Sequence, residues 1–303
     1  MSDPNTMQSL SHDESAGPAQ SVAALAEFFE RHRRILVLSG AGISTASGIP
    51  AYRGRDGVRR GHAPVQGPEF RKLEAVRKRY WARSMIGYAT MAQATPNPAH
   101  LALAALQAAG RLAPLMTQNV DGLHQRAGSS AVLELHGSIH HVVCLDCHAP
   151  ISRAAVQQLL AALNPDHVGV PAVAAPDGDA HVESDDLTRF VVAPCPHCGG
   201  TLKPDVVFFG DGVATATTVE AVRRLEQADA LLVVGSSLMV FSGFRFCRMA
   251  AASHKPIAAI NQGITRADDL ITLKIDAAAG QVLPSLLSLL APASVAIDHK
   301  ATP

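Results

Sequence analysis

Four cysteines in two C-x-x-C pairs carry the most specific spacing in the chain: Cys144, Cys147, Cys195 and Cys198. Each pair lets two thiolates converge on one tetrahedral ion, and four thiolates form a closed zinc site with no open coordination position. We therefore predict one zinc ion with a structural role, in a compartment that keeps thiols reduced. A redox dithiol is the alternative. The fifth cysteine, Cys247, lies in an apolar helical pattern and is predicted to be a buried thiol.

A glycine-rich stretch at 40–53, GAGISTASGIPAYR, directly follows an apolar run at 34–39 that predicts a buried parallel strand. Its first two glycines allow a sharp turn and a close approach to a ligand, and small residues follow. This order predicts a strand, a glycine loop and a helix whose start binds a diphosphate. Thr45 replaces the third glycine of the common dinucleotide fingerprint, so a tight turn without a ligand is the alternative. Tyr52 and Arg53 are expected to close over the dinucleotide.

Polar residues follow the next predicted strand, 112–117, in the stretch TQNVDGLH. Ligands of open α/β sheets bind beyond the carboxyl ends of strands, where Gln118, Asn119 and Asp121 are expected to lie. Their amide and carboxylate groups can bind a sugar and a carboxamide. A capped turn is the alternative reading, because Asn and Asp are favoured in turns.

One histidine, His136, ends the apolar run 133–135 and is followed by Gly137. Most isolated histidines are structural, and the chain has 14 of them. A histidine at a strand end that faces the nucleotide crevice is nevertheless a good candidate base, because its pKa lies near neutrality.

Composition limits the possible classes of protein. The chain has 303 residues, is 48% hydrophobic and balances 26 Lys and Arg against 26 Asp and Glu, so neither nucleic acid nor membrane is expected as a partner. No apolar run approaches the roughly 20 residues of a membrane helix. The first 18 residues include acidic residues but no Lys or Arg, which argues against a targeting signal and favours a cytoplasmic protein.

Helical and strand patterns alternate along most of the chain. Helices are predicted at 21–32, 99–109, 216–227 and 244–252, and strands at 230–234 and 257–260. This alternation predicts the α/β class: a Rossmann-like, doubly wound parallel sheet with a smaller zinc-ribbon domain inserted. The predicted divisions are a disordered arm at 1–18, a dinucleotide-binding domain at 19–135 and 202–292, a zinc-binding insertion at 136–201 with part of 54–95 as a helical lid, and a flexible tail at 293–303.

Together these motifs resemble the sirtuins, the NAD-dependent protein lysine deacylases. The resemblance covers roughly 23–290 and rests on the glycine-rich stretch, TQNVDGLH, the two cysteine pairs and the motifs LHGS (135–138), LKPDVVFFGD (202–211), VVGSSLMV (233–240) and INQG (260–263). Within the family, RYWAR (79–83), TPNPAH (95–100), APDGD (175–179) and the long spacer between the cysteine pairs resemble class II, the branch of the fourth human sirtuin.

The resemblance implies a site for NAD as co-substrate. The cofactor-binding residues that it implies are Gly40, Ala41, Gly42, Ile43, Ser44, Ile49, Pro50, Ala51, Tyr52, Arg53, Gln118, Asn119, Val120, Asp121, Gly235, Ser236, Ser237, Asn261, Gln262, Gly263 and Ala279. The diphosphate would lie on the glycine loop and the two serines, the adenosine ribose on Asn261 and Gln262, and the nicotinamide carboxamide on Ile43 and Asp121.

The family reaction implies the catalytic roles. The acyl-lysine carbonyl oxygen attacks the ribose carbon as nicotinamide leaves, and the acyl group ends on ADP-ribose. His136 would be the general base and Asn119 the second catalytic residue. The substrate peptide would lie as an added strand between two segments that include Val207, Phe208, Phe209 and Val240. A protein ADP-ribosyltransferase on the same scaffold and a non-catalytic NAD or ADP-ribose-binding module are the alternatives. The expected partners are acylated-lysine proteins, and a monomer is favoured.

Two departures from the family pattern affect these expectations. Ala51 stands where the family usually has an acidic residue, so any contact of that carboxylate is absent. Phe241-Ser242-Gly243 replaces a proline-containing run of the substrate groove, which predicts an effect on peptide preference and none on NAD.

Tyr80 and Arg83 form a Y-x-x-R pair on one face of a predicted helix. In class III sirtuins, which remove succinyl and malonyl groups, such a pair binds the acyl carboxylate. A phenol and a guanidinium suit that ligand, so the pair predicts a preference for acidic or long acyl groups. An ordinary basic helix face is the alternative.

Overall fold

Six parallel strands form the larger sheet of the computed structural model, which describes residues 18–60, 63–170, 173–174, 180–181, 187 and 189–290. The strand order is β11-β10-β9-β1-β2-β3. The strands are β1 (Ile35–Ser39), β2 (Met116–Thr117), β3 (Leu133–Glu134), β9 (Ala230–Val234), β10 (Ile257–Ile260) and β11 (Leu273–Ile275). Residues 1–17 of the predicted arm and the predicted tail at 293–303 lie outside the described residues.

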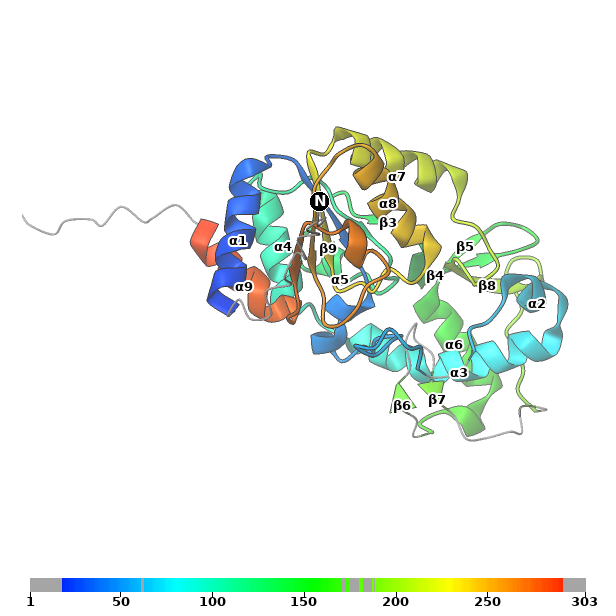
Figure 1. The fold of residues 1–303 in the computed structure, drawn as a ribbon. Helices are drawn as coiled ribbons and strands as arrows, with labels where there is room; N and C mark the ends of the chain where they lie inside the picture. Colours follow the sequence, from blue (N-terminus) through cyan, green and yellow to red (C-terminus); the bar gives the residue numbers. More distant parts are fainter. Residues whose placement is uncertain are drawn as a thin grey trace, which may run out of the picture.

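Helices cover both faces of this sheet, so the predicted doubly wound architecture is confirmed. One face carries α1 (Pro18–Arg31), α4 (Pro98–Ala108) and α9 (Ala279–Leu290), and the other α7 (Thr215–Gln227) and α8 (Phe241–Ala252) (Figure 1). Strand β1 is buried throughout, with Ile35 and Val37 in the first core and Leu36 and Leu38 in the second. This is why its sequence is continuously apolar and not alternating.

The order of the strands locates the ligand crevice. Read from β3, the sheet runs third, second, first, fourth, fifth, sixth along the chain, so the winding direction reverses between β1 and β9. In open α/β sheets, ligands bind at the carboxyl ends of the strands beside this reversal. The glycine loop after β1 and the serines after β9 meet there.

A smaller antiparallel sheet lies beside the large one, in the order β5-β4-β8. Its strands are β4 (Gly137–Cys144), β5 (Pro150–Ser152) and β8 (Leu202–Val206), and α2 (Gly67–Lys72), α3 (Glu74–Gln93) and α6 (Arg153–Leu163) share its hydrophobic core. A separate pair is formed by β6 (Val173–Ala174) and β7 (Ala180–His181). We call the small sheet with α2, α3 and α6 the small module.

The predicted division assigns residues 202–206 to the second part of the large domain, whereas in the structure they form β8, which pairs with β4 of the small sheet. Cys144 is opposite Leu202 in this pairing, directly after the second cysteine pair. A strand pattern in a sequence does not identify the partner strand, and the cysteine pairs lie at the end where β4 and β8 pair.

In the described stretch 40–60, no α-helix follows the glycine loop, so the helix predicted directly after it is wrong. Two short 3₁₀ turns, Ala41–Ile43 and Thr45–Ser47, take its place, and Gly48 then adopts a left-handed conformation with φ of 85°. The Thr45 hydroxyl donates to the Gly42 carbonyl (3.1 Å), a local bond that competes with helix formation. This region, which is rich in Ser, Thr and Gly, therefore forms two short 3₁₀ turns and does not continue into an α-helix.

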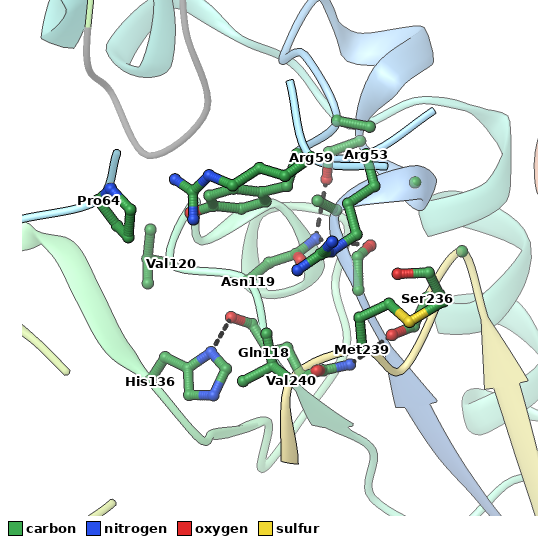
Figure 2. Close-up of a pocket in the computed structure, with 18 of the residues that line it drawn as sticks. Arg53, Arg59, Pro64, Gln118, Asn119, Val120, His136, Ser236, Met239 and Val240 are labelled. Atoms are coloured by element: carbon green, nitrogen blue, oxygen red, sulfur yellow. Dashed lines mark hydrogen bonds between the residues drawn. The ribbon is translucent and has the colours of Figure 1, made fainter. Parts of the chain in front are cut away.

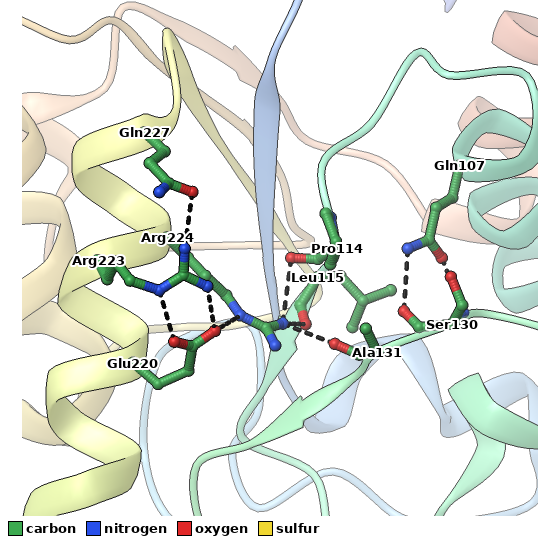
Figure 3. Close-up of polar contacts among 9 residues, drawn as sticks. All are labelled: Gln107, Pro114, Leu115, Ser130, Ala131, Glu220, Arg223, Arg224 and Gln227. Carbon is green, nitrogen blue, oxygen red and sulfur yellow. Dashed lines mark hydrogen bonds and ion pairs between the residues drawn. The ribbon is translucent and has the colours of Figure 1, made fainter.

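Arg224 of α7 ties that helix to the amino-terminal end of the sheet (Figure 3). Its guanidinium donates to the carbonyls of Leu115 (3.1 Å) and Ala131 (2.7 Å) and to the Glu220 carboxylate (2.8 Å). The side chain is only 14% exposed, whereas neighbouring Arg223 is 52% exposed.

We expect Arg224→Ala to lower the free energy of unfolding by about 1–3 kcal/mol, because the change removes all the hydrogen bonds of a mostly buried side chain, including the one to the carbonyl of buried Leu115. Arg223→Ala is the matched control and should change the stability little, since exposed ion pairs contribute little. Urea unfolding followed by circular dichroism measures both. Equal losses in the two variants would mean that the bonds to Leu115 and Ala131 are unimportant.

Candidate active site

A pocket of about 900 Å³ lies at the carboxyl ends of β1, β2, β9 and β10, between the large sheet and the small module. Almost all the predicted cofactor, catalytic and substrate residues line it. Two do not. The Ile43 side chain is buried in the core of the large sheet, and Gly263 donates its N–H to Asp276 (3.2 Å). The residues predicted from the sequence motifs lie far apart in the chain, and the fold brings most of them together around this pocket.

The glycines of the first loop allow two segments of backbone to touch. Gly42 donates its N–H to the Gly235 carbonyl (2.7 Å), and Gly40 donates to Val234 (3.0 Å). A Cβ atom on Gly42 would lie 2.8 Å from the Gly235 oxygen, which is too close for any side chain. The sequence predicted that these two N–H groups bind a diphosphate. In the structure they instead hold the loop against the end of β9.

A buried hydrogen-bond network forms the floor of the pocket. Asn119 donates its side-chain N–H to the Gly40 carbonyl (3.2 Å) and the Ser44 hydroxyl (3.1 Å). Ser44 in turn donates to the Asp121 carboxylate (2.7 Å). Asn119, Ser44 and Asp121 are each 8% exposed or less, and Gly40 is buried as well. A network that is satisfied in this way holds its members in one orientation.

His136 lies at the pocket wall, where β3 has ended and β4 begins. Its Nδ1 is 2.8 Å from the Gln118 carbonyl oxygen (Figure 2), and its Nε2 is 2.8 Å from the Ser242 hydroxyl. A carbonyl oxygen only accepts, so Nδ1 carries the proton and Nε2 keeps its lone pair. Burial lowers the pKa of His136 below its ordinary value; the bond to Gln118 opposes this and the charge of Arg245 adds to it. The ring is therefore a neutral base at neutral pH.

Two arginines form the opposite side of the pocket. Figure 2 shows Arg53 and Arg59 on the other side of Asn119 from His136. Arg53 donates to the Gly57 carbonyl (2.9 Å), and the Arg59 guanidinium lies 5.3 Å from the centre of the Phe209 ring. Cations above a polar floor suit an anionic ligand such as a dinucleotide diphosphate. Pocket size, serines, amides and these cations all fit NAD.

Tyr80 and Arg83 of α3 also line the pocket, from the small module. The Tyr80 ring makes edge contacts with Phe70 and Phe208, with ring centres 5.5 and 5.3 Å away. Arg83 donates its Nε–H to the Ala180 carbonyl (3.2 Å). The Y-x-x-R spacing therefore does place both residues on the pocket side of one helix.

The four cysteines converge at the edge of the small sheet, with all four sulfur atoms within 4.8 Å of one another. The Sγ atoms of Cys144 and Cys198 are 3.6 Å apart, and those of Cys147 and Cys195 are 3.8 Å apart. Tetrahedral zinc with Zn–S bonds of about 2.3 Å separates its sulfur ligands by about 3.8 Å. The cysteines are positioned to bind one zinc ion, as predicted, far along β4 from His136.

Two buried histidines lie beneath the floor of the pocket. His124 Nε2 is 2.8 Å from the Ser39 hydroxyl, and its ring packs edge-on against His100 with centres 4.9 Å apart. Burial lowers the pKa of His124 to about 3 and that of His100 to about 4. Both rings are therefore neutral in the folded protein at pH 7.

This pair predicts acid lability. In the unfolded chain both histidines bind protons below about pH 6.5. In the folded chain they do so only near pH 4 and 3. The unfolded state then binds more protons, so stability is complete above pH 6.5 and falls as the pH drops. We expect about 2–4 kcal/mol to be lost between pH 7 and 5. Urea unfolding at both pH values measures it.

His100→Gln should reduce that loss, and His254→Asn at an exposed site should leave it unchanged. A loss of the same size in His100→Gln would assign the acid sensitivity to other groups.

Some pocket residues had no signal in the sequence. Ser242, Arg245 and Arg59 line the pocket, but none belongs to a recognisable spacing. From the sequence, Ser242 is only part of a segment that departs from the family pattern in the peptide groove. Its contact with His136 depends on how α8 packs against Gln118.

The fold and the pocket define a dinucleotide-binding α/β protein with a four-cysteine metal module. The model of the Sir2 family matches residues 40–242. The chain belongs to this family, the sirtuins.

Curated relatives agree with this family. An NAD-dependent protein deacetylase of Xanthomonas axonopodis pv. citri is 50% identical over 89% of this chain and 92% of its own length. The NAD-dependent protein deacetylase 3 of Pseudomonas syringae pv. tomato is 52% identical over 84% of this chain and 91% of its own.

Solved structures show the same fold. A structure described as the basis for the mechanism and regulation of Sir2 enzymes has a TM-score of 0.68 at 32% identity and covers 88% of this chain and 96% of its own. Sir2 bound to acetylated peptide has a TM-score of 0.70 at 26% identity, covering 88% and 98%.

Proposed function

We propose that this protein is an NAD-dependent protein-lysine deacylase, which transfers the acyl group of acyl-lysine to ADP-ribose and releases nicotinamide. The observation that carries the proposal is His136, whose Nε2 lone pair lies at the wall of a pocket that fits NAD. Relatives about 50% identical are named NAD-dependent protein deacetylases, which supports the same activity.

The chain's own residues supply binding, orientation and proton transfer. Bound NAD supplies the ribose carbon from which nicotinamide departs. Asn119, Ser44 and Asp121 form a fixed polar floor that orients the nicotinamide ribose and carboxamide. His136 then accepts a proton at Nε2 from a ribose hydroxyl, while its Nδ1–H stays bonded to the Gln118 carbonyl. The Gln118 bond fixes the tautomer throughout.

The substrate peptide is expected between the segment after β8 and the segment before α8. Phe209, Val240 and Phe241 are exposed apolar residues on these two segments. Val207 and Phe208 line the pocket beside them. An extended peptide can add main-chain bonds there and insert its acyl-lysine between the two walls.

Mass spectrometry of the products from NAD and a panel of acyl-lysine peptides tests this function. The expected products are O-acyl-ADP-ribose and the peptide with its lysine side chain deacylated. ADP-ribosylated protein would instead indicate the transferase, and unconsumed NAD would indicate a binding module.

We also propose a preference for acidic acyl groups such as succinyl or glutaryl. Tyr80 and Arg83 line the pocket together, and Arg153, fully buried, adds a positive charge 4.3 Å from the Tyr88 ring on the same helix. Among the described residues, Arg153 donates to the Gln157 side chain (2.7 Å) and to the Ser84 carbonyl (3.1 Å), and to no carboxylate.

Arg83→Met should erase the preference for acidic over acetyl peptides and leave deacetylation largely intact, because only the carboxylate loses its partner. The ratio of kcat/KM for succinyl- and acetyl-lysine peptides measures it. Arg79→Met, on the same helix but outside the pocket, is the matched control. Equal loss on both peptides would assign Arg83 to the fold or to NAD.

Class II membership is supported by RYWAR and TPNPAH, while APDGD lies outside the described residues. We infer a cytoplasmic location because zinc-binding thiolates stay reduced there. Among the described helices, none has the length and apolar character to cross a membrane. We expect a monomer that acts on acylated proteins, without nucleic acid.

A further inference from the structure

The first turn of α8 brings a hydroxyl group to the catalytic base. Ser242 is the second residue of this helix, and its Oγ lies 2.8 Å from His136 Nε2. Gly243 follows, and a Cβ atom there would lie 2.4 Å from the Gln118 side-chain oxygen. The missing side chain at 243 lets α8 approach Gln118 closely, and this approach delivers Ser242 to the ring. The segment Phe241-Ser242-Gly243, which departs from the family pattern, therefore contacts the base His136 as well as forming part of the predicted substrate groove.

The direction of this hydrogen bond follows from the other side of the ring. Nδ1 carries the imidazole proton because the Gln118 carbonyl can only accept. Nε2 of the neutral ring is then an acceptor, and the Ser242 hydroxyl is the donor. When the ring is protonated, the same hydroxyl can turn and accept from Nε2–H, because an oxygen of this kind does both.

We propose that Ser242 is a positioning residue for His136, which holds the imidazole against the pocket wall from Nε2 until a ribose hydroxyl takes its place. The inference rests on the proposed deacylase function. Nε2 has one lone pair, so the substrate hydroxyl must displace Ser242 before it gives up its proton. That proton moves to Nε2, and Ser242 rotates aside with its own proton retained.

The charged groups around the ring do not change in the variants proposed below. Arg245 on α8 is the cation whose charge acts on His136. The carboxylates on the neighbouring segments include Glu134 at the end of β3, which accepts from Gln125, Asp205 near the end of β8, and Asp121 after β2, which accepts from Ser44. A difference between wild type and a Ser242 variant therefore reports the hydroxyl.

Ser242→Ala should lower the midpoint of the acid limb of kcat/KM by roughly 0.4 to 1 pH unit, because a hydroxyl bonds more strongly to the charged ring than to the neutral one. It should also lower kcat several-fold while KM for NAD changes little, since the ring loses one of its two anchors. Ser242→Thr, which keeps the hydroxyl, should restore both values. Ser253→Ala, at the exposed end of α8, is the control and should match wild type.

An NMR titration of the His136 imidazole, assigned by comparison with His136→Gln, measures the same midpoint without activity. Ser242→Cys replaces Ser242→Ala if the latter fails to fold, since it keeps the size and weakens the hydrogen bond. An unchanged midpoint in the titration, or Ser242→Thr as impaired as Ser242→Ala, overturns the proposal. Absence of deacylation in the wild type would refute the proposed function alone, because the titration would still test the contact.

Discussion

Replacing His136 with alanine should reduce NAD-dependent deacylation by a factor of roughly 10² or more, the scale of losing a general base. We place this ring at the ribose hydroxyl, with Nδ1 held by the Gln118 carbonyl and with an Nε2 lone pair that accepts from Ser242 until the ribose hydroxyl takes its place. The fold should survive, because the side chain lies at the pocket wall and not in a hydrophobic core. Steady-state product formation and the melting temperature measure the two effects.

His141→Gln is the matched control, since His141 is exposed on β4 and does not line the pocket. It should keep the wild-type rate. A His136→Ala variant that turns over near the wild-type rate would remove His136 from the mechanism.

Replacing Cys195 with alanine should remove the zinc ion and lower the melting temperature by roughly 10 °C or more, because a structural metal contributes to folding directly. Cys195 is buried against the core that α3 and α6 share with the small sheet, so its loss weakens that whole module. Metal analysis should find one zinc per wild-type chain and a reduced amount in the variant. The variant should lose stability and solubility, whereas the turnover of the protein that stays folded should change little, since a closed metal site takes no part in catalysis.

Cys247→Ala is the control for a buried thiol outside the metal site, and its zinc content should stay at one. Folded, active wild-type protein without zinc would refute the prediction.

The sequence predicted some elements of the large sheet to the residue. Both β9 and β10 have the predicted bounds, because each is an apolar run buried on both faces between turn residues. The strand predicted at 112–117 is shorter: β2 holds only Met116 and Thr117, and Leu112 forms a lone bridge to Ile35. Pro114 explains the gap, since proline has no N–H for the ladder.

The candidate site was predictable where short motifs carry several functional side chains at once. His136 and Asn119 were found in this way. The contact of Ser242 with His136 was not, because it joins residues 106 positions apart and depends on the docking of α8 against Gln118. No local spacing encodes such an approach.

The chain passes repeatedly between the large sheet and the small module, and the pocket lies between them. Residues from α3 and from the segment after β8 line one wall, and the loops after β1, β9 and β10 line the other. A ligand that contacts both walls binds best at one angle between the large sheet and the small module. Binding of the ligand therefore shifts the protein toward that angle, and a protein already at that angle binds the ligand more tightly. Saturating NAD and peptide should then raise the unfolding temperature of the whole chain together, by mass action on a single cooperative unit.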